Sequence, residues 1–230
     1  MKFLNPFKEF TKTEWIIWLC SVFVIIATSF IGGTDGILGV ITSLLGVTAV
    51  MFVSKGDVTG QMLSVVFSLL YAFISYQTRY YGEMITYLFM TAPVSLISVI
   101  TWLKNPYSRE KNEVKIHKIR KNEVIAIFLI AAVVTFVFYF ILKFLNTANL
   151  VISTISITTS FVAASFAAKR SPYYAFFYMF NDIVLIVMWI MVTVSDISYV
   201  GVIICFVMFL VNDIYGFYNW KRIEKRQNGC

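Results

Sequence analysis

Two short apolar segments each place an Asn-Asp pair shortly before a tryptophan, with the carboxylate seven residues ahead of the ring. The segments are VNDIYGFYNWKRI at 211–223, with Asn212, Asp213 and Trp220, and FNDIVLIVMW at 180–189, with Asn181, Asp182 and Trp189. Residues seven apart share one face of a helix, so each carboxylate lies in line with an aromatic ring. Such a pairing suits the binding of a small polar or cationic molecule.

A carboxylate at the centre of a membrane-spanning helix costs about 2.5 to 3.5 kcal/mol, so it faces the protein interior or a wet cavity and has a partner. At 1.5 Å per residue, Asp182 lies about 15 Å and Asp213 about 12 Å from the same membrane surface. Two interpretations fit this matched depth. The pairs either line a central binding site or act as hydrogen-bonded clips between helices.

Other polar and aromatic residues on neighbouring helical faces extend the predicted site. Tyr178 shares the face of Asp182, and Gly216 leaves room beside Asp213. The candidate substrate-binding residues are Asn181, Asp182, Asn212, Asp213, Tyr178, Trp189, Gln61, Ser64, Tyr87, Thr91, Ser95 and Ser98. Aromatic faces, amides, hydroxyls and carboxylates together suit a flat, hydrogen-bonding molecule that is neutral or cationic. Trp102 and Trp220, at helix ends, are expected to be packing or interfacial residues.

Nothing in the sequence predicts chemistry on a substrate. There is no histidine cluster, metal-ligand spacing, nucleophile motif or glycine-rich phosphate loop. We therefore expect no enzymatic activity, no cofactor and no metal. The sequence leaves open whether a carboxylate couples binding to a proton.

The composition is that of a membrane protein. The chain has 230 residues, of which 59% are hydrophobic and 13% charged, with mean hydropathy +0.80; soluble domains have about 25% charged residues. The net charge of +7 comes from short clusters between apolar runs. Such clusters indicate membrane topology rather than nucleic-acid binding, and the lipid bilayer is the expected surrounding.

Eight apolar runs are long enough to cross a bilayer, which takes about 20 residues as a helix. They are 14–31, 36–53, 58–78, 81–103, 123–145, 148–168, 172–194 and 197–219. The first is expected to be a spanning helix and not a cleaved signal peptide, since no small-residue cleavage site follows it. The sequence thus predicts an all-α protein with eight transmembrane helices.

The distribution of basic residues predicts the orientation. Lys and Arg concentrate in cytoplasmic loops, and placing the N-terminus inside puts all but Arg79 and Lys143 of the 19 basic residues on that side. Both termini are therefore predicted to be cytoplasmic, in a multi-pass protein of the cell membrane.

A shift of 118 residues lays the third and fourth runs on the seventh and eighth. In that register Ser64 falls on Asp182, Ser95 on Asp213 and Trp102 on Trp220. Units four helices apart cross the membrane in the same direction, so the repeat is parallel. The predicted organisation is an N-terminal tail and additional helix at 1–35, a first three-helix repeat at 36–104, a basic loop and linker helix at 105–145, a second repeat at 146–222 and a tail at 223–230.

Three segments resemble the PnuC-type vitamin transporters over roughly 36–223. They are GVTAVMFVSKGDVTGQMLSVVFSLLYAFISYQTRYYGEM at 46–84, Trp102-Leu103-Lys104, and VNDIYGFYNWKR at 211–222, which is similar to the family pattern Asn-x-Ile-Tyr-Gly-x-Tyr-x-Trp. The resemblance implies a SWEET-like three-plus-one-plus-three fold. It also implies uptake of nicotinamide riboside by facilitated diffusion, with trapping by cytosolic phosphorylation.

The resemblance leaves the substrate open. In the family's nicotinamide riboside branch, an amide stands near the position of Ser95, and the helix at 180–189 carries Asn without Asp. The added Asp182 could pair with a cationic ring or accept from the amino groups of a base. Related branches carry thiamine, riboflavin or deoxynucleosides, and a scaffold or sensor without transport is the alternative of another class. The sequence does not decide whether the chain forms a homo-oligomer.

Overall fold

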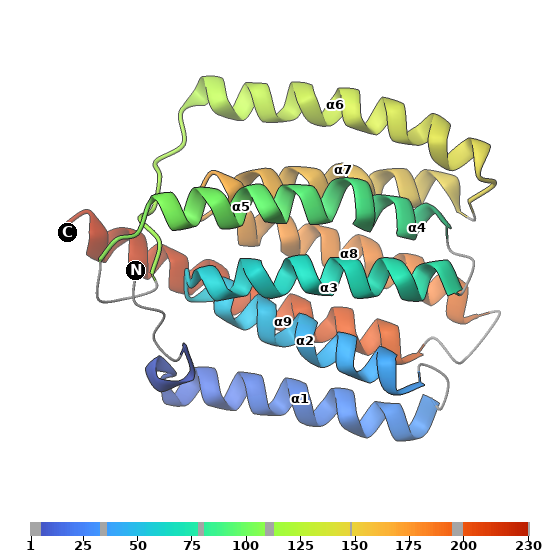
Figure 1. Cartoon of the computed structure of the whole chain (residues 1–230), viewed down its shortest axis with the longest axis horizontal. Coiled ribbons are helices and arrows are strands. Elements are labelled where there is room, and N and C mark those ends of the chain that lie inside the picture. Colours follow the sequence, from blue (N-terminus) through green and yellow to red (C-terminus); the bar gives the residue numbers. More distant parts are fainter. Residues whose placement is uncertain are drawn as a thin grey trace.

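The computed structural model describes residues 6–32, 36–77, 81–108, 113–147, 149–194 and 200–229. Within them the chain forms long helices that run side by side along one direction (Figure 1). The elements are a 3-10 helix η1 (Pro6–Glu9), α1 (Lys12–Gly32), α2 (Gly36–Ser54), α3 (Val58–Gln77), α4 (Tyr81–Thr86), a π-helix η2 (Tyr87–Thr91), α5 (Ala92–Lys104), α6 (Lys121–Phe144), α7 (Leu150–Ala168), α8 (Tyr174–Thr193) and α9 (Val200–Gln227).

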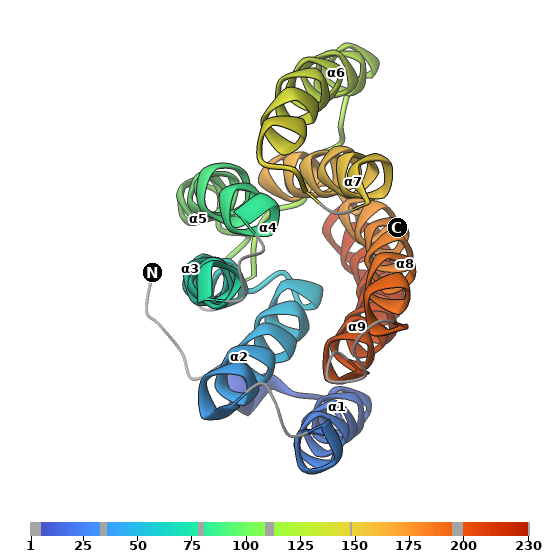
Figure 2. The same ribbon diagram turned by 90° about the vertical axis from the view of Figure 1, so that its right-hand side faces the viewer.

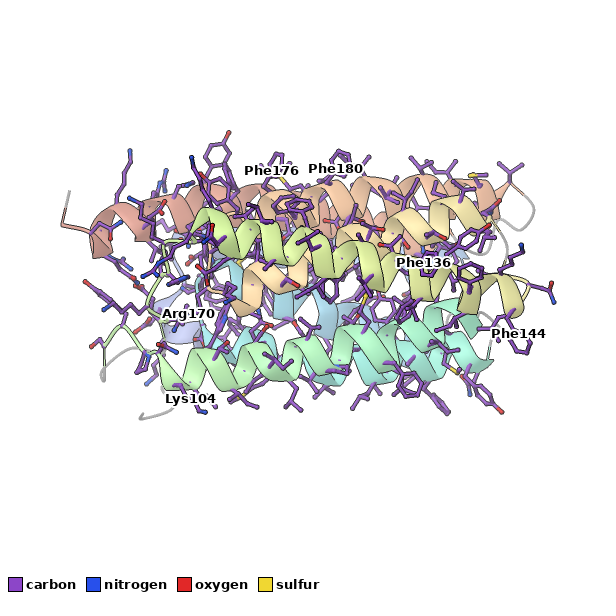
Figure 3. The ribbon with its side chains drawn as sticks, turned by 90° about the horizontal axis from the view of Figure 1, so that it is seen from above. Lys104, Phe136, Phe144, Arg170, Phe176 and Phe180 are labelled. Atoms are coloured by element: carbon purple, nitrogen blue, oxygen red, sulfur yellow. The ribbon has the colours of Figure 1, made fainter. Side chains whose placement is uncertain are left out.

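Eight helical segments in the described residues are long and apolar enough to cross a membrane, with α4, η2 and α5 together making one of them. This confirms the predicted all-α membrane protein with eight spans. Large apolar side chains cover the outside of the bundle, as lipid contact requires. Phe136 and Phe144 on α6 and Phe176 and Phe180 on α8 are exposed, and Figure 3 shows them projecting away from their helices.

The helices form two groups of three, with two further helices outside them. Seen end-on, α2, α3 and the α4–α5 span face α7, α8 and α9 (Figure 2). The groups meet where α2 packs on α9 and where α5 packs on α7. Helix α6 packs chiefly against α7, and its Phe128 ring lies 6.0 Å from that of Phe177 on α8. Helix α1 packs against both α2 and α9.

The two groups exchange hydrogen bonds at one end of the bundle in matching pairs. The indole of Trp102 donates to the backbone oxygen of Ala167 at 2.8 Å, and the indole of Trp220 donates to that of Val53 at 2.8 Å. The residue before each tryptophan donates to the next carbonyl: Thr101 to Ala168 O and Asn219 to Ser54 O, both at 3.0 Å. We call these four bonds the crossed clasp. Each group closes over the last turn of the other group's first helix.

The first helices of the two groups also end alike. Gly56 and Arg170 both have a positive φ, +71° and +57°, the left-handed turn that commonly ends a helix. Their N–H groups donate to Val53 O and Ala167 O, the carbonyls that the tryptophans share. The matched turns and the crossed clasp occur at equivalent places in the two groups. The parallel repeat and its assignment to the SWEET type stay predictions.

A π-helical turn interrupts the fourth span. Pro93 at the start of α5 has no N–H to donate and crowds the turn before it, and such positions commonly carry π-bulges or kinks. In η2 the N–H of Ala92 reaches back five residues to Tyr87 O. The extra residue in this turn brings Tyr87 and Thr91 onto the inward side of the helix.

Helix α1 is docked on the core through buried polar contacts. Glu14 accepts from Lys55 Nζ at 3.0 Å, at the end of α2, and from the hydroxyl of Tyr215 at 2.9 Å, on α9. Trp18 donates to Thr48 Oγ1 at 3.1 Å. The additional N-terminal helix therefore joins α2 to α9 on the outer side of their contact.

Element η1, the last turn of α9 and the described residues between α5 and α6 lie at the same end of the bundle (Figure 1). Lys104 and Arg170 lie at that end, opposite Phe144 (Figure 3). The side of the membrane on which this end lies stays a prediction, and Arg79 falls outside the described residues. Helix α9 continues beyond the predicted span to Gln227, where Gln227 Nε2 donates to Glu113 Oε1 at 2.8 Å.

Candidate substrate cavity

A cavity of about 100 Å³ lies inside the bundle between the two helix groups. It is lined by Gly46, Ala49, Val50, Val53, Gln61, Ser64, Phe67, Ser68, Tyr87, Thr91, Ser95, Ser160, Tyr174, Tyr178, Asn181, Asp182, Leu185, Phe206, Phe209 and Asp213. The volume admits several water molecules, at roughly 15 Å³ each. It is below the ~300 Å³ at which typical ligand pockets begin, so a nucleoside-sized molecule fits only if the helices or side chains move apart.

Asp182 on α8 and Asp213 on α9 form the most polar point of the cavity wall. Both residues are almost completely buried, with 3% and 4% of their surface exposed, and their carboxyl groups are in hydrogen-bonding contact with each other. Oδ2 of Asp182 is buried and accepts no hydrogen bond from a donor group of the described chain. Two carboxylates in contact repel each other, so either a cation lies between them or one of them holds a proton.

Asn181 is fixed next to this pair by helix α7. Its Oδ1 accepts from the hydroxyl of Thr159 at 2.7 Å and from that of Ser160 at 2.8 Å. With the oxygen held in this way, the amide nitrogen remains to donate into the cavity, which Asn181 lines. The site therefore offers an amide donor beside a carboxyl pair.

The first helix group supplies the opposite wall, which is polar but uncharged. Gln61, Ser64, Tyr87, Thr91 and Ser95 line it. The hydroxyl of Ser64 donates to Gly60 O at 2.9 Å, so its lone pairs remain as acceptors. No Lys, Arg or His is among the described residues that line the cavity. The carboxyl pair thus faces amide and hydroxyl groups and no fixed cation.

Aromatic rings close the cavity at several points. The ring of Tyr87 lies 4.4 Å from that of Tyr71, and the ring of Phe67 lies 5.9 Å from that of Phe209. Gly46 makes room for the last two, because a Cβ there would lie 2.8 Å from ring atoms of both Phe67 and Phe209. A flat ligand would meet ring faces and edges on entering.

Nine of the twelve predicted site residues line this one cavity, and three do not. Asn212 is fully buried on the other side of α9, where its Nδ2 donates to Ser21 Oγ on α1 at 3.1 Å and to Met208 O at 2.7 Å. Trp189 packs in the apolar core with Met188 and Cys205. Ser98 is buried and donates to Val94 O at 2.9 Å. Asn212 therefore acts as an interhelical clip, whereas Asp182, Asp213 and Asn181 line the cavity.

The sequence reasoning missed Ser160 and Tyr174 among the polar lining residues. Ser160 lies in the segment TTSFVAA on α7, the helix whose hydroxyls bond Asn181. Tyr174 lies one turn before Tyr178 on the same face of α8. Helical spacing could have found Tyr174. Trp102 and Trp220 are fully buried with their rings 5.5 Å apart, so they are packing residues of the crossed clasp and not interfacial ones.

The model of one protein family, described as nicotinamide mononucleotide transporter, matches residues 36–222. Two curated proteins named nicotinamide riboside transporter PnuC are similar over most of the chain. The protein of Neisseria mucosa is 25% identical over 93% of this chain and 82% of its own length. That of Haemophilus influenzae is 21% identical over 99% of this chain and 96% of its own length.

A solved structure has the same fold. The crystal structure of the vitamin B3 transporter PnuC superposes with a TM-score of 0.81, at 22% identity, over 95% of this chain and 94% of that one. At this identity the likeness concerns the fold.

Proposed function

The chain belongs to the nicotinamide mononucleotide transporter family, and from that premise we propose that it carries nicotinamide riboside, or a similar nucleoside-like vitamin, across the cell membrane. It is a multi-pass membrane transporter of the PnuC type and not an enzyme. The observation that supports the substrate class is the cavity between the two helix groups, whose lining combines tyrosine rings, amides, hydroxyls and the Asp182–Asp213 pair.

We propose facilitated diffusion as the mechanism, with cytosolic phosphorylation trapping the product. The cavity has side chains that can hold a ribosyl group by hydrogen bonds, such as Gln61, Ser64 and Ser95. A phosphorylated product carries extra negative charge, which the carboxyl pair would repel. Phosphorylation therefore converts the substrate into a molecule that the site does not bind.

A second candidate substrate is a vitamin or nucleoside of a related branch, such as thiamine, riboflavin or a deoxynucleoside. The carboxyl pair favours ligands with a cationic ring or with amino groups, both of which a carboxylate binds well. Thiamine offers the first and a deoxynucleoside with an amino-bearing base offers the second.

Binding to the purified protein and uptake into proteoliposomes test these proposals. We expect saturable binding of nicotinamide riboside or of one compound in a panel with thiamine, riboflavin and deoxynucleosides. Asp182→Ala and Asp213→Ala should each weaken binding at least about tenfold, since a hydrogen bond to a charged group contributes about 1.5 to 3 kcal/mol. Cys20→Ser, at an exposed position on α1, is the control.

The absence of saturable binding and uptake for the whole panel would leave a scaffold or sensor as the better account. Unchanged affinity in both aspartate variants, with binding otherwise intact, would mean that these carboxyls serve only to hold helices together. The folded state of each variant is checked by its elution as a single species and by its thermal unfolding.

A further inference from the structure

The carboxyl pair is isolated from any fixed positive charge. Among the described lining residues there is no basic side chain, and the five ion pairs of the described chain lie elsewhere. Removing a charge from water into a protein interior costs several kcal/mol when no counter-charge accompanies it. Two buried carboxylates in contact would incur this cost twice and would also repel each other.

The contact between the two carboxyl groups offers a way to avoid a double charge. The side chains of Asp182 and Asp213 lie close enough to hydrogen-bond one another, and a hydrogen bond between two carboxyl groups needs one proton between them. The pair then carries one negative charge.

We propose that Asp182 and Asp213 share a single proton in the ligand-free cavity, and that the positive charge of a bound substrate takes that proton's place. This deepens, and rests on, the proposed function. Nicotinamide riboside carries a permanent positive charge on its pyridinium ring. When it binds, the carboxyl–carboxyl hydrogen bond breaks, the proton leaves to solvent, and both carboxylates face the cation. The net charge of the site is the same before and after.

The neighbouring titratable groups named here do not provide a positive charge that could replace the shared proton. Tyr174 and Tyr178 on α8, Tyr87 on η2 and Cys205 on α9 are neutral in their ordinary state near pH 7. Glu83 on α4 interacts with Tyr87, which in turn interacts with Asp182. The carboxyl–carboxyl contact itself is confined to α8 and α9.

The exchange of the shared proton for the bound cation determines how much net charge transport moves. A carrier that returns empty with the proton, after releasing the cation, moves one positive charge in each direction. Uptake is then electrically neutral, and at equal pH on both sides the substrate gradient alone drives it, as facilitated diffusion requires. The site also prefers a cation to an uncharged molecule of the same shape, because an uncharged ligand leaves the proton in place.

Calorimetric titration of the purified protein with nicotinamide riboside tests the exchange. Repeating it in buffers of different ionisation enthalpy counts the protons released. We expect one proton per ligand and an affinity that rises about tenfold for each pH unit, as linkage of one proton requires. The reduced, uncharged form of the same riboside should release none. Asp182→Asn should abolish proton release and the pH dependence, whereas Glu224→Gln, a surface carboxyl paired with Lys221, should retain both.

Infrared spectroscopy of the ligand-free protein provides a test that needs no substrate. The carbonyl band of a protonated carboxyl group should be present at neutral pH and be lost in Asp182→Asn. Binding of nicotinamide riboside without proton release, or a band unchanged in the variant, would overturn the inference while the proposed function stands. Failure of nicotinamide riboside to bind counts against the proposed function, and the infrared band then decides the inference separately.

Discussion

Replacing Glu14 with glutamine tests how the N-terminal helix is held. The Glu14 carboxylate accepts from Lys55 Nζ, from the Tyr215 hydroxyl and from the N–H of Thr11. A glutamine can keep one oxygen acceptor but must direct its amide group at Lys55 or at Tyr215. Directed at Lys55, the amide places a donor against a donor, and directed at Tyr215 it makes the hydroxyl an acceptor; in both cases the lysine charge loses its carboxylate partner.

The expected loss of stability is about 3 kcal/mol. The side chains of Glu14 and Lys55 are 4% and 11% exposed, so the pair is desolvated, and breaking a buried pair from one side costs about 3 to 5 kcal/mol. We take the lower end because Lys55 keeps its bond to Glu9 O and lies 4.8 Å from the centre of the Phe10 ring. Tyr215→Phe removes one hydrogen bond and should cost about 1 kcal/mol.

A double-mutant cycle with Lys55→Met separates the pair from its surroundings. The free energy of unfolding of the purified protein in detergent is measured for wild type, Glu14→Gln, Lys55→Met and the double variant. We expect the double variant to lose about 2 kcal/mol less than the sum of the single variants, because the coupling vanishes once both charges are gone. Simple additivity, or a Glu14→Gln loss no larger than that of Tyr215→Phe, would refute the account of a desolvated pair.

Three further changes test the turn, the cavity wall and the amide. Gly56→Ala should lower the free energy of unfolding by about 1 to 2 kcal/mol from backbone strain alone, since φ is +71° and no neighbouring atom lies nearer than 3.7 Å to the added Cβ; a loss above about 4 kcal/mol in thermal unfolding would contradict this. Gly46→Ala should push the rings of Phe67 and Phe209 into the cavity and weaken substrate binding severalfold, measured by titration; unaltered affinity would show that the rings move outward instead. Asn181→Ala should cost about 1 to 3 kcal/mol by freeing two hydroxyl donors, and it should weaken binding in the same assay; a fully stable variant would argue against the fixed amide.

The number and approximate limits of the spans followed from hydropathy, because lipid contact requires long apolar helices whatever their packing. The repeat register was informative at the site. Ser64 and Asp182, and Ser95 and Asp213, which the 118-residue shift aligns, all line the same cavity. Equivalent positions of a repeat are expected to face a common centre, and the two aligned pairs lie in the wall of one cavity.

Neighbouring residues on one helix were harder to assign. Asn212 and Asp213 differ by about 100° around the helix axis; Asp213 faces the cavity, and Asn212 turns to α1. Asn181 and Asp182 have the same spacing on α8, yet both line the cavity. The seven-residue spacing places Trp189 on the face of Asp182 but does not say how far along the helix the cavity extends. The sequence pattern contains no information on which helix packs on which face.

The π-helical turn was also absent from the prediction. A continuous apolar run from 81 to 103 satisfies the length of a membrane span with or without a bulge, and Pro93 was the one local signal of an irregular turn. Because η2 brings Tyr87 and Thr91 inward, this irregularity determines part of the binding surface.

The crossed clasp affects the equilibrium between closed and open conformations of the bundle. It consists of the bonds made by Trp102, Trp220, Thr101 and Asn219. All four bonds connect one helix group to the other, so separation of the groups at that end breaks them together. At about 1 kcal/mol net for each bond, the clasp favours the shut arrangement by about 4 kcal/mol, or roughly a thousandfold in occupancy. Opening at that end therefore requires all four bonds to break together, and the clasp adds this cost to any movement that widens the bundle there.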